Sequence, residues 1–401
     1  MGDMISITDQ LADENIWHGF LEYKRNQPGA SSDFKEIEAF IKDKGYLSVI
    51  SDIGNDRFPL PRKKIISKMS TQKKRTVYVY PRAHTIVLKL ITYLMIRRYD
   101  HLFGNNLYSF RPSLGSGDAI RHLTSVPDME GFYSYKVDIS DYFNSVNTGM
   151  FLPMLHEILS DDPELYGFLA KLLTEEHVIW KDEIISERKG IMAGTPIASF
   201  FANIYLMEMD KHFEHMKIPY ARYSDDIIIF SKDEKELQEH IGYIREFLCH
   251  RGLEVNHNKE EYSEPGGKWT FLGFSYENGT IDISPVSIHK IKGKMRRKAR
   301  ALRRWGDRND IAGERCAGAF IRIFNRKLLE SSEDKDLTWS FWYFPVINTD
   351  KGLHEIDRYA QDTIRYLISG RRNKGRYKVR YEDLKKLGYK SLVNEYYKFG
   401  S

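Results

Sequence analysis

The sequence predicts an α+β fold in which a sheet is backed by helices. Two stretches read as strands, Tyr133 to Ile139 and Ile227 to Phe230, because they are rich in β-branched and aromatic residues. Elsewhere apolar residues recur every three or four positions, the spacing of a helix that packs one face on a core. At 401 residues the chain is too long for one ordinary core, so two or three lobes are expected.

The helical segments and a hairpin can be placed individually. Apolar residues at helical spacing predict one helix around residues 202–213 and a second around residues 237–248, the latter ending before Gly252. Both stripes are interpreted as core-facing. Further along, Asn278-Gly279 separates two short strand-like stretches, which is a strong hairpin signal.

Composition excludes several classes of protein. Hydrophobic residues make up 41% and aromatic residues 13% of the chain, against 29% charged residues, so a disordered chain is excluded. No apolar run approaches the length of a membrane span, and the acidic, polar start does not resemble a secretory signal. The two cysteines, Cys249 and Cys316, cannot form a disulfide framework or a zinc cluster. We therefore expect a cytosolic protein with no membrane partner.

The net charge of +5 is unevenly distributed. Residues 1–56 hold 11 acidic and 5 basic residues, whereas residues 57–98 hold 12 basic residues and no acidic one. Residues 371–380 hold six basic residues and no acid. A short charge run is usually a solvated surface, but basic stretches of this length favour a polyanionic partner such as nucleic acid.

The acidic residues that suggest chemistry lie at strand ends. Asp225 and Asp226 occupy a turn before a very apolar strand, and Asp138 ends the strand that begins at Tyr133. An isolated Asp-Asp pair is often only an acidic hairpin tip. If the two strands are neighbours, however, Asp138 and Asp225 can converge on two cations about 4 Å apart, the geometry for in-line displacement at phosphorus. Mg²⁺ is the expected ion because Mg²⁺ prefers oxygen ligands such as these carboxylates, and Mn²⁺ is the expected substitute.

Six segments across about residues 57–285 occur in an order typical of one family of polymerases. They are Lys73-Lys74-Arg75 with Tyr108 to Pro112 (fingers), Asp138 with Phe143 (motif A), Gly190 to Leu206 (motif B), Tyr223-Ser224-Asp225-Asp226 (motif C), Leu253, Asn256 and Lys259 (motif D), and Phe271 to Phe274 (primer grip). By these segments the chain resembles the reverse transcriptases of the bacterial, group II intron-like kind.

The resemblance implies a right-hand polymerase fold with fingers, an antiparallel palm sheet, a helical thumb and an α-helical C-terminal part. The expected boundaries are an acidic N-terminal extension at 1–56, fingers at 57–137, palm at 138–285, basic thumb at 286–330, and an RNA-binding thumb extension at 331–401.

The resemblance also implies roles for individual residues. Asp138, Asp225 and Asp226 would be catalytic, and with the Ile139 carbonyl they would hold the metal ions. The dNTP would be contacted by Lys74, Arg75, Phe143, Gly194, Pro196 and Lys259. Phe143 would exclude a 2′-hydroxyl, although it could equally be core filler, and Lys259 would protonate the pyrophosphate. Phe271, Leu272 and Gly273 would grip the primer.

One position departs from the family pattern. Many relatives carry Pro-Gln-Gly in motif B, whereas this chain has Met192-Ala193-Gly194 and so lacks the glutamine amide. Ordinary templating is thereby put in doubt, although the metal chemistry is not. The defence-associated and abortive-infection enzymes resemble this chain more than intron maturases do.

Basic segments are the expected nucleic-acid contacts. Residues 286–308 contain ten basic residues and one acid in a helical pattern with one apolar face, which predicts a thumb helix along a duplex backbone. The candidate residues are Arg111, Lys294, Arg296, Arg297, Arg300, Arg371 and Arg372.

The resemblance implies an RNA-directed DNA polymerase that adds dNTPs to a 3′-hydroxyl. It also implies that the partners would be an RNA template, expected to be a structured non-coding RNA, and the DNA product, in the cytoplasm of a bacterium defending against phage. The alternatives are an untemplated deoxynucleotide polymerase on the same palm, an inactive RNA-binding scaffold, and an RNA-dependent RNA polymerase, which Phe143 disfavours.

Overall fold

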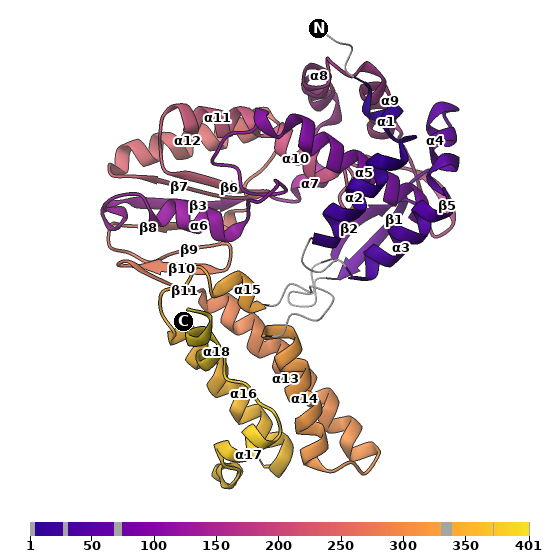
Figure 1. Cartoon of the computed structure of the whole chain (residues 1–401). Coiled ribbons are helices and arrows are strands. Elements are labelled where there is room, and N and C mark those ends of the chain that lie inside the picture. Colours follow the sequence, from indigo (N-terminus) through magenta and orange to yellow (C-terminus); the bar gives the residue numbers. More distant parts are fainter. Residues whose placement is uncertain (1–4, 27–30, 68–73, 330–338, 372, 401) are drawn as a thin grey trace. The chain divides into compact units, whose positions relative to one another are not determined.

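The computed structural model describes residues 5–26, 31–67, 74–329, 339–371 and 373–400. The chain forms two compact units, Met1–Pro265 and Gly266–Ser401 (Figure 1). The division lies about twenty residues before the palm–thumb boundary expected at 285. It also joins residues 286–330 and 331–401, which were expected to be separate, in one unit. Both differences follow from packing partners that the sequence does not reveal.

The first unit contains two sheets and twelve α-helices among its described residues. Its strands are β1 (Arg62–Ser67), β2 (Lys74–Val79), β3 (Tyr133–Asp138), β4 (His177–Trp180), β5 (Glu183–Ser186), β6 (Tyr220–Tyr223), β7 (Asp226–Ser231) and β8 (Glu261–Ser263). Its helices are α1 (Ile7–Gln10), α2 (Glu14–Asn26), α3 (Ser31–Lys42), α4 (Tyr46–Gly54), α5 (Arg82–Tyr99), α6 (Ser116–Thr124), α7 (Tyr142–Ser145), α8 (Thr148–Ile158), α9 (Pro163–Thr174), α10 (Ala198–Tyr205), α11 (Met207–His215) and α12 (Glu234–His250).

The central sheet of this unit has the strand order β6-β7-β3-β8 and is antiparallel throughout. The expected pairing of the strands around 133–139 and 227–230 is confirmed, since Tyr133 lies opposite Ser231 and Asp138 opposite Asp226. The apolar residues of β7, Ile227 to Phe230, are fully buried. Helices α11 and α12 pack along one face of the sheet (Figure 1).

The two predicted helical stripes are both buried, but the first one spans two helices. Ala202, Leu206, Met209 and Phe213 are all fully buried, yet α10 ends at Tyr205 and α11 begins at Met207, with Leu206 between them. The second stripe lies on α12, which ends two residues before Gly252, and this glycine has a φ of +69°. The burial interpretation is confirmed for both.

A second sheet, β2-β1-β4-β5, lies in the same unit. Its strands carry the start of the acid-free basic stretch, with Lys74 and Arg75 at the beginning of β2. The acidic N-terminal segment is folded rather than separate, because α1, α2 and α4 pack on α5. Trp17 and Phe20 of α2 are fully buried in the same core as the central sheet.

The second unit combines a small antiparallel sheet with a helical bundle. Its elements are β9 (Trp269–Phe271), β10 (Phe274–Glu277), β11 (Thr280–Ile283), α13 (Pro285–Arg308), α14 (Gly313–Leu328), α15 (Trp339–Tyr343), α16 (Lys351–Ser369), the 3₁₀ helix η4 (Lys374–Lys378), α17 (Tyr381–Lys386) and α18 (Leu392–Phe399).

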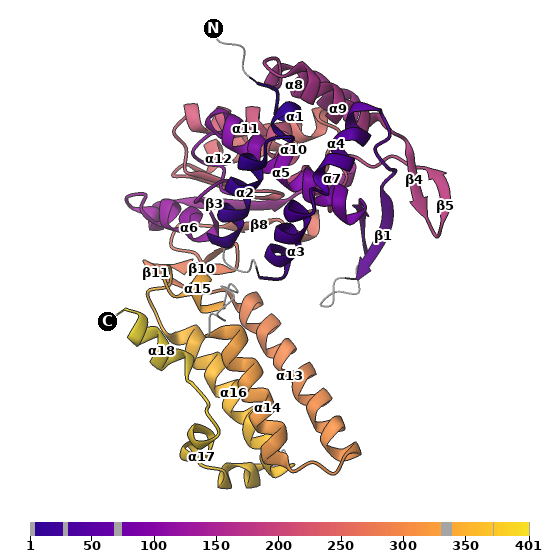
Figure 2. The same ribbon diagram turned by 45° about the vertical axis from the view of Figure 1, so that its right-hand side comes forward.

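The strands of this sheet pair only with one another in the described chain, in the order β11-β10-β9, and the expected palm boundary at 285 stays a prediction. The Asn278-Gly279 hairpin is confirmed, and both turn residues have positive φ, +47° and +73°. The long helices α13, α14 and α16 lie side by side (Figure 2) and pack on one another. The expected α+β class is therefore confirmed.

Candidate active site

Three aspartates from two distant segments of the chain meet at one end of the central sheet. Asp138 is the last residue of β3 and lies directly opposite Asp226, the first residue of β7. Directly opposed residues of an antiparallel pair have Cα atoms about 4.5–5.5 Å apart. Asp225 lies in the turn between β6 and β7, and its carbonyl accepts a hydrogen bond of 3.1 Å from the Ile139 amide. The expected clustering of Asp138, Asp225 and Asp226 is thus present in the fold.

The electrostatics of this cluster are those of an acidic site that the protein neutralises only in part, because one ion pair, Lys259 with Asp138, faces three carboxylates. Burial raises the pKa of Asp225, and the charge of Asp138 raises it further. Burial, followed by the charges of Asp225 and Asp138, raises the pKa of Asp226 to about 6. Adjacent carboxylates destabilise one another when ionised unless a cation balances them. The cluster therefore has a free-energy reason to bind positive charge.

Asp138 is held by two side chains from the segment after α12. The Lys259 Nζ donates to Asp138 Oδ2 at 2.5 Å, and the Asn256 amide nitrogen donates to Oδ1 at 3.2 Å. The Asn256 backbone amide also donates to the Asp138 carbonyl at 2.7 Å. Lys259, expected to contact the departing pyrophosphate, thus forms an ion pair with the motif A carboxylate, and the expected proton transfer stays a prediction.

The donors fit a metal site that substrate completes. In the described part of the chain, no three Asp, Glu, His or Cys side chains are grouped closely enough to hold a metal ion by themselves. The site offers carboxylate oxygens and the carbonyl of Ile139, to which no described residue donates a hydrogen bond. These are the hard oxygen ligands that Mg²⁺ prefers, and Mg²⁺ usually keeps several waters and substrate phosphates in its shell.

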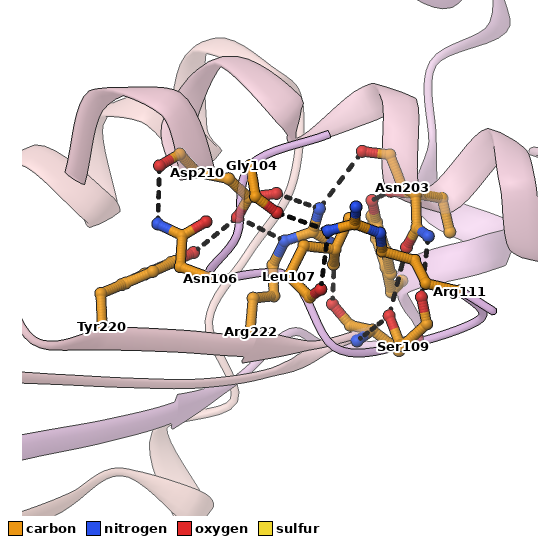
Figure 3. A network of polar contacts seen from close by, with 12 residues as sticks. Gly104, Asn106, Leu107, Ser109, Arg111, Asn203, Asp210, Tyr220 and Arg222 are labelled. Atoms are coloured by element: carbon orange, nitrogen blue, oxygen red, sulfur yellow. Dashed lines mark hydrogen bonds and ion pairs between the residues drawn. The ribbon is translucent and has the colours of Figure 1, made fainter. Parts of the chain in front are cut away.

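A buried polar network, whose residues Ser109, Asp210 and Arg222 are seen in Figure 3, holds the turn that carries Asp225. Ser224 precedes Asp225 and has a φ of +60°, a conformation that costs a non-glycine residue free energy. The Ser224 amide donates to Ser109 Oγ at 2.9 Å, and its carbonyl accepts from the Arg222 guanidinium at 3.3 Å. The backbone amide and carbonyl of Ser224 therefore both form hydrogen bonds with side chains from the protein interior.

Arg222 and Asp210 form the centre of this network. Their side chains are completely buried, and Arg222 donates to both carboxylate oxygens at 2.7 and 2.5 Å. The Tyr220 hydroxyl donates to Asp210 at 2.9 Å, and Arg222 also reaches the Asn203 carbonyl at 3.2 Å. Sequence reasoning assigned no role to these residues, although a charged residue in the apolar segment before Asp225 was an available signal.

Arg111, expected to contact nucleic acid, lies among partners within the protein. Its side chain is only 8% exposed and forms an ion pair with Asp100 at 2.8 Å. It also donates to the carbonyls of Gly104 at 2.6 Å and Leu107 at 3.2 Å. Arg111 shares the loop at residues 104–111 with Ser109, so it stabilises the backbone that supports the turn carrying Asp225 (Figure 3). Its expected contact with nucleic acid stays a prediction, although these intramolecular partners already occupy the guanidinium.

Phe143 lies beside one of the two expected phosphate-binding residues. Its ring is half-buried in α7, and the Arg75 guanidinium carbon is 5.7 Å from the ring centre. Lys74 and Arg75 are both exposed at the start of β2. The structure therefore brings the expected sugar-contacting ring and one of the expected phosphate-binding cations together from segments about seventy residues apart.

The motif B loop is clamped between Phe143 and β2. Gly190 has a φ of +55°, and a Cβ there would lie 2.2 Å from the Phe143 carbonyl oxygen. Gly194 has a φ of +98°, and a Cβ there would lie 2.9 Å from Val77 Cβ. Only glycine fits both positions.

Ala193 is completely buried, and its carbonyl accepts from the Tyr78 amide at 2.7 Å. Pro196 lies two residues before α10, and its carbonyl accepts from Ser199 Oγ at 3.0 Å. At the position where many relatives carry a glutamine, this chain therefore has a small side chain that is closed off by its surroundings.

The remaining candidate residues lie in the second unit. Phe271 ends β9 and is buried, while Leu272 and Gly273 form a tight turn with φ of +49° and +93°. Lys294, Arg296, Arg297 and Arg300 are exposed on α13, and Arg371 is exposed after α16. Arg372 lies outside the described residues.

The comparisons with known proteins identify the family. The family model described as "Reverse transcriptase (RNA-dependent DNA polymerase)" matches residues 66–276, which is more than half of the chain. This protein therefore belongs to the reverse transcriptase family. An enzymatic polyprotein of Cassava vein mosaic virus is 34% identical over 92 residues, which are 23% of this chain and 14% of the polyprotein.

Solved telomerase structures are similar at a more distant level. Telomerase from Candida albicans, in complex with a fragment of telomeric RNA, is 12% identical with a TM-score of 0.45, covering 89% of this chain and 68% of that one. Apo telomerase from Candida tropicalis is 11% identical with a TM-score of 0.47, covering 78% of this chain and 57% of that one.

No helix of the described residues is both long and apolar enough to cross a membrane.

Proposed function

We propose that this protein is an RNA-directed DNA polymerase that extends a 3′-hydroxyl with dNTPs by a two-metal mechanism. The observation that carries the proposal is the meeting of Asp138, Asp225 and Asp226 at the end of β3 and β7, within a chain of the reverse transcriptase family. A nucleic-acid-binding scaffold would have no use for three mutually repelling carboxylates at this place.

In the proposed reaction the primer 3′-oxygen bonds to the α-phosphorus of the dNTP. The bond between the α-phosphorus and the oxygen that bridges it to the β-phosphorus breaks, and pyrophosphate leaves. Two bound Mg²⁺ ions would lower the pKa of the 3′-hydroxyl and balance the charge on the pyrophosphate. Asp138 and Asp225, with Asp226 and the Ile139 carbonyl, would hold them, and Mn²⁺ could substitute.

Residues around the carboxylates would position the substrate. Arg75 binds triphosphate oxygens with its planar guanidinium, and Lys74 adds a second positive charge. The Phe143 ring occupies the space of a 2′-hydroxyl and so favours dNTPs. Lys259 gives its proton to the leaving pyrophosphate once substrate has separated it from Asp138. Gly194 and Pro196 shape the loop beneath the base pair.

Template use is the property that most needs a test. The full-length protein is incubated with a primed RNA of known sequence and Mg²⁺, supplied with either one dNTP or all four. RNA-directed synthesis predicts that each single dNTP is added only where its complement is next in the template. An Asp225→Asn protein serves as the inactive control. Addition of any dNTP without regard to the RNA would contradict template use.

Untemplated deoxynucleotide synthesis is a second candidate, favoured by Ala193. A buried methyl group replaces the amide that many relatives have at this position, so one polar contact to substrate or template is missing. The same single-dNTP assay with the RNA omitted distinguishes the two functions, since only an untemplated enzyme keeps its full rate.

We further propose that the template is a structured partner RNA and that the setting is anti-phage defence in a bacterial cytoplasm. The support is the resemblance of motif B to that of the defence-associated enzymes. Sequencing the nucleic acid that copurifies with the wild type and with Asp225→Asn tests this. A single enriched RNA in both, with complementary DNA only in the wild type, is expected. Random RNA fragments in both would contradict a dedicated partner.

A further inference from the structure

The second unit contains a groove between α13 and α16. Its volume is about 240 Å³. Arg296 and Arg300 line it from α13, and Tyr359, Asp362 and Tyr366 line it from α16. Arg376, from η4, completes the lining. The basic segments 286–308 and 371–380, which are separate in the sequence, therefore contribute to one cavity.

The groove carries positive charge that the protein itself does not neutralise. Arg376 donates to Asp362 at 3.2 Å. Arg296 and Arg300 are exposed, and neither forms an ion pair with any described residue. They are one helical turn apart on α13, about 6 Å along its axis. Two adjacent guanidinium groups in a concave site favour phosphate oxygens as ligands.

The opposite wall adds aromatic surface to this charge. Tyr359 and Tyr366 are half-buried and lie two turns apart on α16. Proteins bind single-stranded nucleic acids in positively charged grooves that contain aromatic side chains, because the unpaired bases stack on the aromatic rings. The volume lies below the roughly 300–1,000 Å³ of sites that enclose a whole small ligand. A duplex keeps its bases stacked inside and cannot insert one into such a cavity.

We propose that this groove binds a single-stranded stretch of nucleic acid, one nucleotide at a time. Arg296 and Arg300 contact its phosphates, and Tyr359 of α16 contacts an unpaired base. The inference deepens the proposed polymerase function by separating two parts of the basic surface. The groove takes single strands, whereas Arg297 and Arg304, which do not line it, remain available to a duplex.

The test compares two double variants with the same change of charge on the same helix. One is Arg296→Gln with Arg300→Gln, and the other is Arg297→Gln with Arg304→Gln. Fluorescence anisotropy measures binding of labelled short single-stranded RNA, single-stranded DNA of the same sequence, and the RNA–DNA duplex. The full-length protein is used without nucleotides, so no synthesis occurs and loss of polymerase activity does not affect the result.

The groove variant should bind the single strands at least about tenfold more weakly than wild type. The slope of log Kd against log salt should fall by about 1.4, since each phosphate contact on a single strand contributes about 0.7. The Arg297/Arg304 variant should retain single-strand binding and lose duplex binding. Preference for RNA, or equal binding of RNA and DNA, supports the proposal and identifies the strand.

Equal loss in both variants, or no loss in the groove variant, would overturn the proposal. Tyr359→Leu provides a second, uncharged test, because it removes the aromatic ring and keeps a side chain that packs. It should weaken single-strand binding without changing the salt slope, and unchanged affinity for this variant also overturns the proposal. Thermal melting of each variant confirms that it is folded before binding is compared.

Discussion

The buried pair of Arg222 and Asp210 should matter to stability and to catalysis in separable ways. Replacing Arg222 by Met removes the partner of a carboxylate that has no solvent exposure. Breaking one side of a buried ion pair costs about 3–5 kcal/mol, because the remaining charge stays desolvated. We therefore expect Arg222→Met to lose about that much free energy of unfolding.

The double variant Arg222→Met with Asp210→Leu separates the two effects. It removes both charges, and a buried pair replaced by apolar groups is often neutral in stability. The Tyr220 hydroxyl, which donates to Asp210 at 2.9 Å, then loses its acceptor at a cost of about 1–3 kcal/mol. The double variant should therefore be more stable than the single variant. Its primer extension should nevertheless remain slower than that of the wild type, because the Ser224 carbonyl has lost the Arg222 guanidinium as its hydrogen-bond donor.

Urea unfolding followed by tryptophan fluorescence measures the stabilities, and primer extension measures the activity. Lys232→Met is the control, since Lys232 pairs with Asp128 at 2.8 Å with both side chains more than half exposed. An exposed pair contributes at most about 1 kcal/mol. The reasoning is refuted if the double variant is no more stable than Arg222→Met, or if it extends primers at the wild-type rate.

Four further outcomes are expected. Asp225→Asn should abolish dNTP incorporation while its melting temperature is no lower than that of the wild type, because it removes one of the mutually repelling charges; measurable extension with Mg²⁺ would contradict its proposed role. Phe143→Ala should allow rNTP incorporation, measured as the ratio of rNTP to dNTP rates; an unchanged ratio removes Phe143 from sugar selection. Gly190→Ala should unfold at lower urea concentration than wild type, because its Cβ would lie 2.2 Å from the Phe143 carbonyl; equal midpoints would contradict that clash. Lys189→Met should stabilise the protein at neutral pH, because burial lowers the pKa of Lys189 to about 8 and penalises its charged form. Between pH 8 and the usual Lys value of 10.5 the native wild type binds fewer protons than its unfolded state, so the free energy of unfolding of the wild type rises with pH. The difference in unfolding free energy between Lys189→Met and the wild type should therefore shrink across that window. A constant difference would contradict the prediction.

The features that sequence reasoning predicted correctly depend on short-range chemistry. Asn278-Gly279 specifies its hairpin through two residues that tolerate positive φ, and the pairing of β10 with β11 followed directly. The strand that ends at Asp138 and the strand that begins at Asp226 were both readable from apolar composition. Their pairing needed only the hypothesis that two acidic strand ends share one function.

The features that it missed depend on which distant residues become neighbours. Nothing near Arg111 indicates that Asp100 and two carbonyls will enclose its guanidinium, so it was interpreted as a nucleic-acid contact. The same holds for Arg222, whose partner Asp210 lies on a different element. The sequence also does not show which strands a sheet joins: residues 274–283 were recognisable as a hairpin, but the pairing of β9, β10 and β11 only with one another among the described strands was not.

The two sides of the catalytic cluster are restrained by different means, and this difference has a physical consequence. Asp225 is held through its neighbour Ser224, whose amide and carbonyl bond to buried groups that nothing in the reaction needs to move. Asp138 is held by Lys259 and Asn256, and the Lys259 side chain is half exposed. The cation that balances Asp138 in the free protein is therefore a side chain that can swing into solvent, while the turn opposite stays fixed. Charge at the site can change partners without moving the backbone that sets its geometry, which is the kind of preorganisation that transition-state stabilisation requires.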